Sequence, residues 1–239
     1  AAYLVPVAMK DSLYWSAVMI QNYAVIALRN IRKHKAYSLI NVAGLAIGIA
    51  VSLFIFVWIR DELSFDRFHA EYRSIYRLTE HQRGADGAVF PVAVTPELLG
   101  PGLKADFPEV LEFARFRPLG RNLVASGEKR FYEDGVAFAD PAFLRMFNFP
   151  LVKGDPATAL AGPDSWIITE STARKFFGSE DPMGRTLRFL DAFDFKVTGV
   201  ARDVPRNSHL RFGILGHFDF VMRELGYGGG WWNNNFYTY

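Results

Sequence analysis

The chain has 239 residues, half of them apolar, and contains no cysteine, which excludes disulfides, thiolate metal sites and cysteine nucleophiles. This length suits one membrane span together with one globular domain of about 170–180 residues. Residues 1–59 carry five basic residues and one acidic residue, whereas residues 60–239 carry 22 basic and 24 acidic residues. Residues 60–239 therefore carry no net positive charge that would attract nucleic acid. The net positive charge of residues 1–59 indicates contact with anionic lipid.

Residues 1–35 are predicted to form a cytoplasmic segment at the membrane surface. Residues 1–18 show no clear period, but from Ile20 onward apolar side chains recur on one side of a helical wheel and polar side chains on the other. The segment ends in a basic cluster, which consists of Arg29, Arg32, Lys33 and Lys35. These charges would be costly in hydrocarbon, so we predict an amphipathic helix in the inner headgroup layer.

An uncharged run of 24 residues follows at positions 36–59, with the sequence AYSLINVAGLAIGIAVSLFIFVWI. As a helix it would be roughly 36 Å long, enough to cross a hydrocarbon core of about 30 Å. A cleaved signal peptide also places basic residues before an apolar run, but its apolar region is usually about 7–15 residues long. We therefore predict a transmembrane helix that is retained.

The charges on either side of this span predict its orientation. The excess of lysine and arginine lies on the N-terminal side, which the positive-inside rule assigns to the cytoplasm. Residues 60–239 are then predicted to form an extracytoplasmic domain, and the protein is predicted to reside in a bacterial cytoplasmic (inner) membrane.

One face of the predicted span carries small residues four positions apart, namely Gly44, Gly48 and Ser52. Such spacing permits two membrane helices to approach closely, which indicates a helix-packing face. Glycine is also common in membrane helices without such a role, so both readings stay open.

The region beyond the span alternates between strand-like runs and short helices. Gly84 to Gly87 indicate a hairpin turn between a strand at 75–80 and a second run at 88–94. Thr95-Pro96 has the pattern of an N-cap followed by proline, and it predicts a helix through about residue 105. Asp140-Pro141 repeats this pattern and predicts a short helix through residue 147. Further strands are predicted at 110–117, 122–126, 129–133 and 136–139.

The later part contains the clearest local signals. A strand at 166–169 precedes a predicted helix at 170–177, which Gly178 ends. A turn at 182–184 leads into a strand at 186–190, which should pair with 193–201. Because strands and helices interleave irregularly, the predicted fold class is α+β.

Few residues are arranged for catalysis. The chain has no G-x-x-x-x-G-K-[ST] phosphate-binding loop, so we do not expect it to hydrolyse ATP alone. Its five histidines are scattered without zinc-ligand spacing, and Ser208-His209 reads as a surface loop. Asp61, Glu62 and Asp66 are expected to form a solvated collar with neighbouring arginines. We therefore predict no enzyme activity, no cofactor and no metal.

Five blocks in order carry a family resemblance: ALRNIRKHKAYSLINVAGLAIGIAVSLFIFVWI, FHAEYRSIYRL, ADPAFLRMFNFPLVKGDPATAL, ITESTARKFFGSEDPMGRTL and KVTGVARDVPRNSHL. Together they resemble the MacB/FtsX-type permease subunits of bacterial ABC transporters and their MacB-like periplasmic core domain. The resemblance extends from about Ile20 to the end of the chain. It implies three further membrane helices beyond residue 239, so the sequence is expected to be part of a longer permease.

The resemblance also implies a function and partners. Such permeases work by mechanotransmission, in which ATP hydrolysis by a cytoplasmic ABC ATPase moves paired outer domains during export or extraction of a substrate. The expected partners are that ATPase, a second permease copy or homologue, and membrane lipid. The alternative is a single-span membrane sensor with an extracytoplasmic ligand-binding domain, whose topology fits the same residues.

Overall fold

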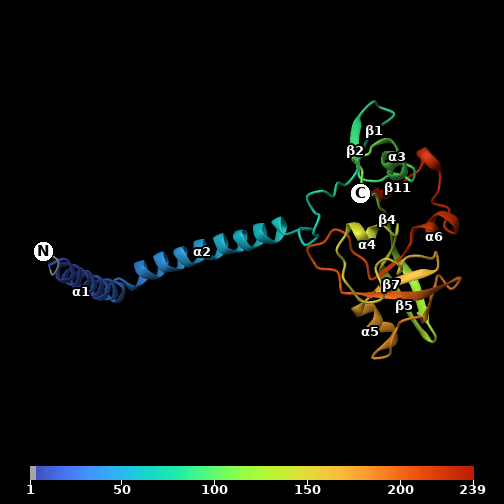
Figure 1. Cartoon of the computed structure of the whole chain (residues 1–239). Helices are drawn as coiled ribbons and strands as arrows, with labels where there is room; N and C mark the ends of the chain where they lie inside the picture. The colour runs from blue at the N-terminus through green and yellow to red at the C-terminus, as the bar shows by residue number, and fades with distance from the viewer. Residues whose placement is uncertain (1–3) are drawn as a thin grey trace. The chain divides into compact units, whose positions relative to one another are not determined.

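The structure is a computed structural model that describes residues 4–239, with side chains described from residue 18 onward. It divides into two compact units, Ala1–Leu63 and Ser64–Tyr239, which we call the N-terminal unit and the outer unit. Figure 1 shows the helices and strands of both units.

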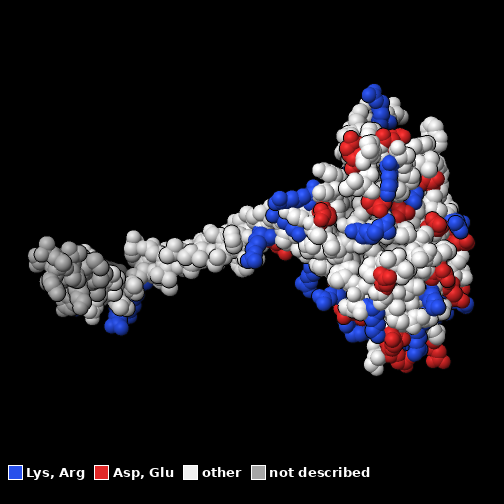
Figure 2. Space-filling view, in the orientation of Figure 1, with Lys and Arg blue, Asp and Glu red and all other residues white. Residues whose placement is uncertain are grey.

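The N-terminal unit consists of two helices, α1 (Leu4–Lys33) and α2 (Lys35–Leu63). Helix α1 begins well before Ile20, so it includes residues 4–18, for which the sequence showed no clear period. Pro6 lies in the first turn, where a missing backbone N–H removes no intrahelical bond. Among the described residues, α2 alone is long and apolar enough to cross a membrane, and none of its residues is buried. Figure 2 shows its long uncharged surface.

The outer unit is a mixed sheet with short helices, which confirms the α+β prediction. A separate hairpin pairs β1 (Glu80–Arg83) with β2 (Val89–Val92) through the predicted turn. The main sheet has the strand order β3-β11-β4-β5-β10-β7-β9-β6, and β8 pairs with both β4 and β9. Its strands are β3 (Thr95–Pro96), β4 (Arg115–Ser126), β5 (Lys129–Ala139), β6 (Leu151–Lys153), β7 (Ser165–Thr169), β8 (Thr186–Phe189), β9 (Phe193–Ala201), β10 (Ile214–His217) and β11 (Asn234–Thr238).

The double pairing of β8 closes six strands into a small barrel. Proceeding around it, β4 pairs with β5, β5 with β10, β10 with β7, β7 with β9, β9 with β8, and β8 again with β4. The pairs β5–β10 and β7–β9 are parallel, and the other four are antiparallel. Closure removes the unpaired edges that these six strands would otherwise present.

Alternation along the strands produces two hydrophobic cores. Phe138 and Trp166 belong to one cluster, which fills the barrel, whereas their chain neighbours Ala137 and Ile167 belong to a second cluster. Successive side chains of a strand point to opposite faces, so a strand buried on both sides supplies both cores. The second core contains the aromatic residues of α4 (Phe143–Met146) and the chain beyond it.

Several local predictions are confirmed. Helix α5 (Glu170–Phe177) has the predicted bounds, begins with the Thr169 side chain accepting from the Thr172 N–H, and ends at Gly178 with a φ of 65°. Strands β8 and β9 pair as expected. The remaining helices are α3 (Leu99–Asp106), α6 (Phe218–Arg223) and the short 3-10 helix η1 (Gly230–Trp232).

Other local predictions are wrong because distant parts of the chain supply stronger partners. Thr95 does not cap a helix but lies in β3, where its hydroxyl contacts the Phe236 carbonyl and, at 2.7 Å, the Thr238 hydroxyl. Asp140 does not cap α4, because its carboxylate accepts three hydrogen bonds from the backbone and guanidinium of Arg115 at 2.8 Å.

Strand bounds also differ from the predictions. The four short strands predicted between residues 110 and 139 are two long strands, β4 and β5, and residues 110–114 lie outside them. The register of β4 against β5 shifts between Pro118 and Gly120 and again between Gly120 and Asn122. These irregularities let both strands continue as a pair. The first strand of the hairpin begins at Glu80 and not at residue 75.

Candidate functional site

The predicted basic cluster lies at the ends of the two N-terminal helices. Arg32 and Lys33 belong to the last turn of α1, and Lys35 is the first residue of α2. These three side chains and Arg29 are exposed. Cations near a helix C-terminus stabilise the helix through its dipole, so the positions of Arg32 and Lys33 have a local reason as well, whereas that of Lys35 does not. Binding of this cluster to anionic lipid stays a prediction.

The predicted helix-packing face lies in the middle of α2. The Ser52 hydroxyl donates to the Gly48 carbonyl at 2.9 Å, which satisfies the hydroxyl within its own helix. A Cβ atom added at Gly44 or Gly48 would meet no atom within 4 Å. The face therefore has room for a neighbouring helix, and its role in assembly stays a prediction.

The first residues of the outer unit, 64–70, form a connecting segment that polar contacts hold to distant loops of that unit. The Asn207 side-chain amide donates to both the carbonyl and the hydroxyl oxygen of Ser64, each at 3.1 Å. The backbone N–H of Asp66 donates to the Asn207 carbonyl at 2.9 Å. These contacts join positions 141–143 residues apart, so they restrain the segment directly after α2.

Asp66 is the central residue of the connecting segment. Its carboxylate accepts from the His209 backbone N–H at 3.1 Å and lies 2.6 Å from His209 Nδ1. The other ring nitrogen, His209 Nε2, lies 2.6 Å from the Tyr239 hydroxyl. Asp66 adopts a φ of 57°, a conformation that aspartate and asparagine tolerate better than most residues. One histidine thus bridges the connecting segment to the last residue of the chain.

His69 fixes the far end of the segment in an aromatic environment. It is 2% exposed, and its ring packs edge-on against Phe147 and Phe149 at 5.1 and 5.2 Å between centroids. Its Nδ1 accepts from the Asn148 backbone N–H at 3.0 Å, and Nε2 has no partner among the described residues. Burial lowers the pKa of His69, and the nearby Asp66 carboxylate opposes that effect. The ring is therefore a neutral core residue at neutral pH.

The contacts of Asp66, His69 and His209 are suited to hold the connecting segment in place. Both nitrogens of His209 are engaged, and Ser208 Oγ donates to the Leu210 carbonyl at 3.2 Å, so the two neighbouring residues do not form a nucleophile and base pair. Burial raises the pKa of Tyr239 above its ordinary value, so its hydroxyl stays protonated. Within the described residues, no group of three or more acidic, histidine or cysteine side chains is placed to hold a metal.

Sequence reasoning missed the connecting segment. It assigned Asp66 to a solvated collar, but the structure places that carboxylate against His209. It read His209 as a surface loop residue, although the loop binds the connecting segment. The only local signals were the aromatic and histidine residues of SFDRFHA, which are unusual for a flexible linker. The partners lie too far away along the chain for any spacing rule to find them.

Comparisons with known proteins agree with this architecture. Residues 38–234 match the family model of the MacB-like periplasmic core domain. A crystal structure of a domain assigned to a permease protein of Porphyromonas gingivalis aligns with a TM-score of 0.62 and 22% identity, over 71% of this chain and 73% of that one. At this identity the likeness concerns the fold alone. No curated protein matches the sequence.

Two further solved structures align less closely. The periplasmic region of MacB from Actinobacillus actinomycetemcomitans has a TM-score of 0.47 and 15% identity, over 61% of this chain and 64% of that one. The extracellular domain of the ABC-type transporter YknZ from Gram-positive bacteria has a TM-score of 0.49 and 13% identity, over 68% of this chain and 82% of that one.

Proposed function

The chain belongs to the MacB-like periplasmic core domain family of ABC-transporter permeases, and from this premise we propose that it couples ATP hydrolysis by a cytoplasmic partner to movement of its outer unit. The family match, which spans residues 38–234 and so includes most of α2 and the outer unit, carries the proposal. The movement would serve export or extraction of a substrate. The single-span sensor lacks comparable support.

The connecting segment offers a physical route for such coupling. Helix α2 ends at Leu63, and the next residue, Ser64, is already bonded to Asn207. Asp66 and His69 then attach the following residues to the His209 loop and to the aromatic core. A displacement of Leu63 would therefore act on the folded outer unit within a few residues and would not be absorbed by a long flexible linker.

The proposed location is the bacterial inner membrane, with α2 spanning it. The length and composition of α2 support a span, and the basic cluster before it supports a cytoplasmic N-terminus. In this topology residues 60–239 are extracytoplasmic, and the basic cluster contacts anionic lipid of the inner leaflet. The proposed domains are the cytoplasmic segment 1–35, the transmembrane helix 36–59 and the extracytoplasmic domain 60–239.

The proposed partners are a cytoplasmic ABC ATPase and a second permease copy or homologue. Residues 1–239 contain no phosphate-binding loop, so ATP would have to be hydrolysed outside these residues, and we assign that step to the ATPase partner. Gly44, Gly48 and Ser52 provide the proposed contact with a neighbouring transmembrane helix. The chain itself is proposed to have no enzyme activity and no cofactor.

Spin-label distances within the complex test the coupling. Residues 1–239 contain no cysteine, so Ser179→Cys introduces their single labelling site, on the exposed residue that follows α5 and Gly178, and any cysteine elsewhere in the complex is replaced by serine. The full-length protein is purified from native membranes with its associated ATPase, and the distance between labels on two copies is measured with and without ATP. We expect the distance distribution to change when ATP is added to the complex with the intact ATPase. We expect no change when ATP is added to a complex whose ATPase has its Walker-motif lysine replaced. Co-purification of a kinase in place of an ATPase, with distances unaffected by ATP, would contradict the proposal and favour the sensor.

A further inference from the structure

A pocket of about 300 Å³ lies at one mouth of the six-stranded barrel. Its walls come from the residues before β7, the first residues of β9, and the end of α6, which follows β10. Because β7 and β9 are parallel and β10 is antiparallel to β7, these three segments meet at the same end of the barrel. Barrel mouths are common places for small ligands, and this volume is at the lower end of their range of about 300–1,000 Å³.

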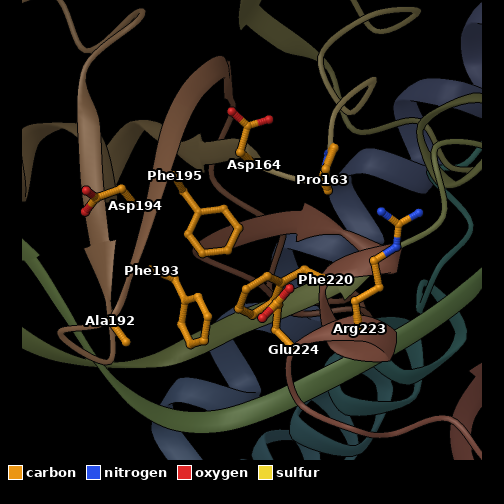
Figure 3. Close-up of a pocket in the computed structure, with 9 residues that line it drawn as sticks. All are labelled: Pro163, Asp164, Ala192, Phe193, Asp194, Phe195, Phe220, Arg223 and Glu224. Atoms are coloured by element: carbon orange, nitrogen blue, oxygen red, sulfur yellow. The ribbon is translucent and has the colours of Figure 1, made fainter.

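Three phenylalanine rings form the floor of the pocket (Figure 3). The Phe220 ring meets Phe193 and Phe195 nearly edge-on, with centroids 4.9 and 4.7 Å apart. Phe195 is stacked on Trp166 at 4.3 Å, and Phe220 is stacked on Phe138 at 5.1 Å. The barrel core therefore holds two of the three rings in fixed positions from behind. Because Phe195 and Phe220 are only 2% and 5% exposed, a ligand would meet mainly the half-buried Phe193 ring, with the other two rings fixed behind it.

The rim of the pocket carries two carboxylates that have no ion-pair or hydrogen-bond partner within residues 18–239, those of Asp164 and Glu224. Both residues are exposed, and in Figure 3 Asp164 lies above the Phe195 ring and Glu224 lies below it. The other charges at the rim are already paired. Arg188 donates two hydrogen bonds to Asp194 at 2.8 and 3.0 Å, and Arg223 lies 3.5 Å from Asp219. The pocket thus combines an aromatic floor with uncompensated negative charge.

We propose that this pocket binds a small organic cation with a flat apolar body. Aromatic rings attract a cation through their negative faces, and weakly hydrated ammonium groups are the preferred ligands of such aromatic surfaces. The apolar body of the ligand covers Phe193, and its positive charge lies between the rim carboxylates. An anion of the same size is excluded by Asp164 and Glu224. The site is independent of ATP-driven movement, so its test does not depend on transport.

The test measures binding of benzyltrimethylammonium to the full chain in a neutral maltoside detergent. Ligand-observed saturation-transfer NMR gives a dissociation constant, and phenylacetate serves as an anion of similar size and shape. The test variant is Asp164→Asn/Glu224→Gln, which removes both rim charges. The matched control is Asp106→Asn/Glu109→Gln, which makes the same charge change at exposed carboxylates that lie outside the pocket and have no ion-pair partner within residues 18–239.

We expect saturable binding of the cation, no saturable binding of phenylacetate, and a loss of affinity of about tenfold in the Asp164/Glu224 variant. The control variant should bind as the wild type does. Phe193→Leu, which keeps an apolar side chain but removes a ring, should also lower the affinity for the cation several-fold. Absence of saturable binding, equal affinities for the two double variants, or equal binding of phenylacetate would each overturn the proposal.

Discussion

Removing the Asp66 carboxylate should release the connecting segment from the outer unit. Asp66→Ala eliminates two hydrogen bonds to His209, of 3.1 and 2.6 Å. Both side chains are about one-third exposed, at 30% and 33%, so each bond is worth about 1 kcal/mol and not the larger value of a buried charged pair. Alanine at a φ of 57° adds a further penalty of about 1 kcal/mol. The expected total is about 3 kcal/mol.

Asp66→Asn separates these contributions. Asparagine tolerates the left-handed conformation and keeps one acceptor oxygen, so the expected cost is about 1 kcal/mol. Hydrogen-exchange mass spectrometry on the full chain reports the local opening of peptides that cover the connecting segment and residues 205–210. We expect exchange there to be about 100-fold faster in Asp66→Ala and about fivefold faster in Asp66→Asn. Glu71→Ala, an exposed position just beyond the segment, is the control and should change neither peptide.

The reasoning fails if Asp66→Ala leaves exchange in both peptides unchanged, because the carboxylate would then not hold the segment. Equal acceleration in the alanine and asparagine variants would show that the negative charge dominates and that the backbone conformation contributes nothing. Acceleration spread evenly over the whole outer unit would show that the segment does not open separately from the core.

Four further outcomes are expected. Because burial lowers the pKa of His69 below its ordinary 6.5, its unfolded form binds more protons, so the outer unit should lose stability as pH falls below about 6.5. Urea unfolding of His69→Asn, which can still accept from the Asn148 N–H, should depend less on pH, and an unchanged slope would contradict this. Gly48→Leu should weaken assembly by about 1–2 kcal/mol relative to Ile55→Leu, as measured by cross-linking of the complete permease, and equal behaviour would mean that the packing face lies elsewhere. Cysteines at Ser126 and Ser179 should react with an impermeant thiol reagent once the outer envelope is permeabilised, and protection until the inner membrane is lysed would reverse the topology. The purified chain should not hydrolyse ATP, and turnover by a preparation free of other ATPases would refute this.

Secondary structure was predictable where its signals are local. Helix α5 has a threonine cap, a charged exposed face and Gly178 at a positive φ, all within ten residues, and its bounds are as predicted. The β8–β9 hairpin is equally local, because its turn joins strands that are neighbours in the chain. The apolar run at 36–59 needs no tertiary information either, since length and composition alone decide whether a helix can span hydrocarbon.

Prediction failed where a residue finds its partner far away in the chain. Thr95-Pro96 has the sequence of a helix start, but β11, about 140 residues later, pairs with it as a strand. Asp66 has the surroundings of an exposed collar, but His209 lies 143 residues away and engages its carboxylate. In both cases the free energy that favours the locally predicted arrangement is about 1 kcal/mol. Burial and hydrogen bonding to a distant segment can contribute more than this.

The sequence by itself thus determined a charged N-terminal segment, a membrane-length helix and a following α+β domain, because each depends on composition or on neighbours within about ten residues. Only the tertiary structure decided that β8 pairs with β4 and closes the barrel, which creates the mouth where Phe193 and Phe220 meet. It also decided that the connecting segment is held to the core. These features depend on which distant strands and loops come together, and alternation of apolar residues identifies the faces of a strand without identifying its neighbours.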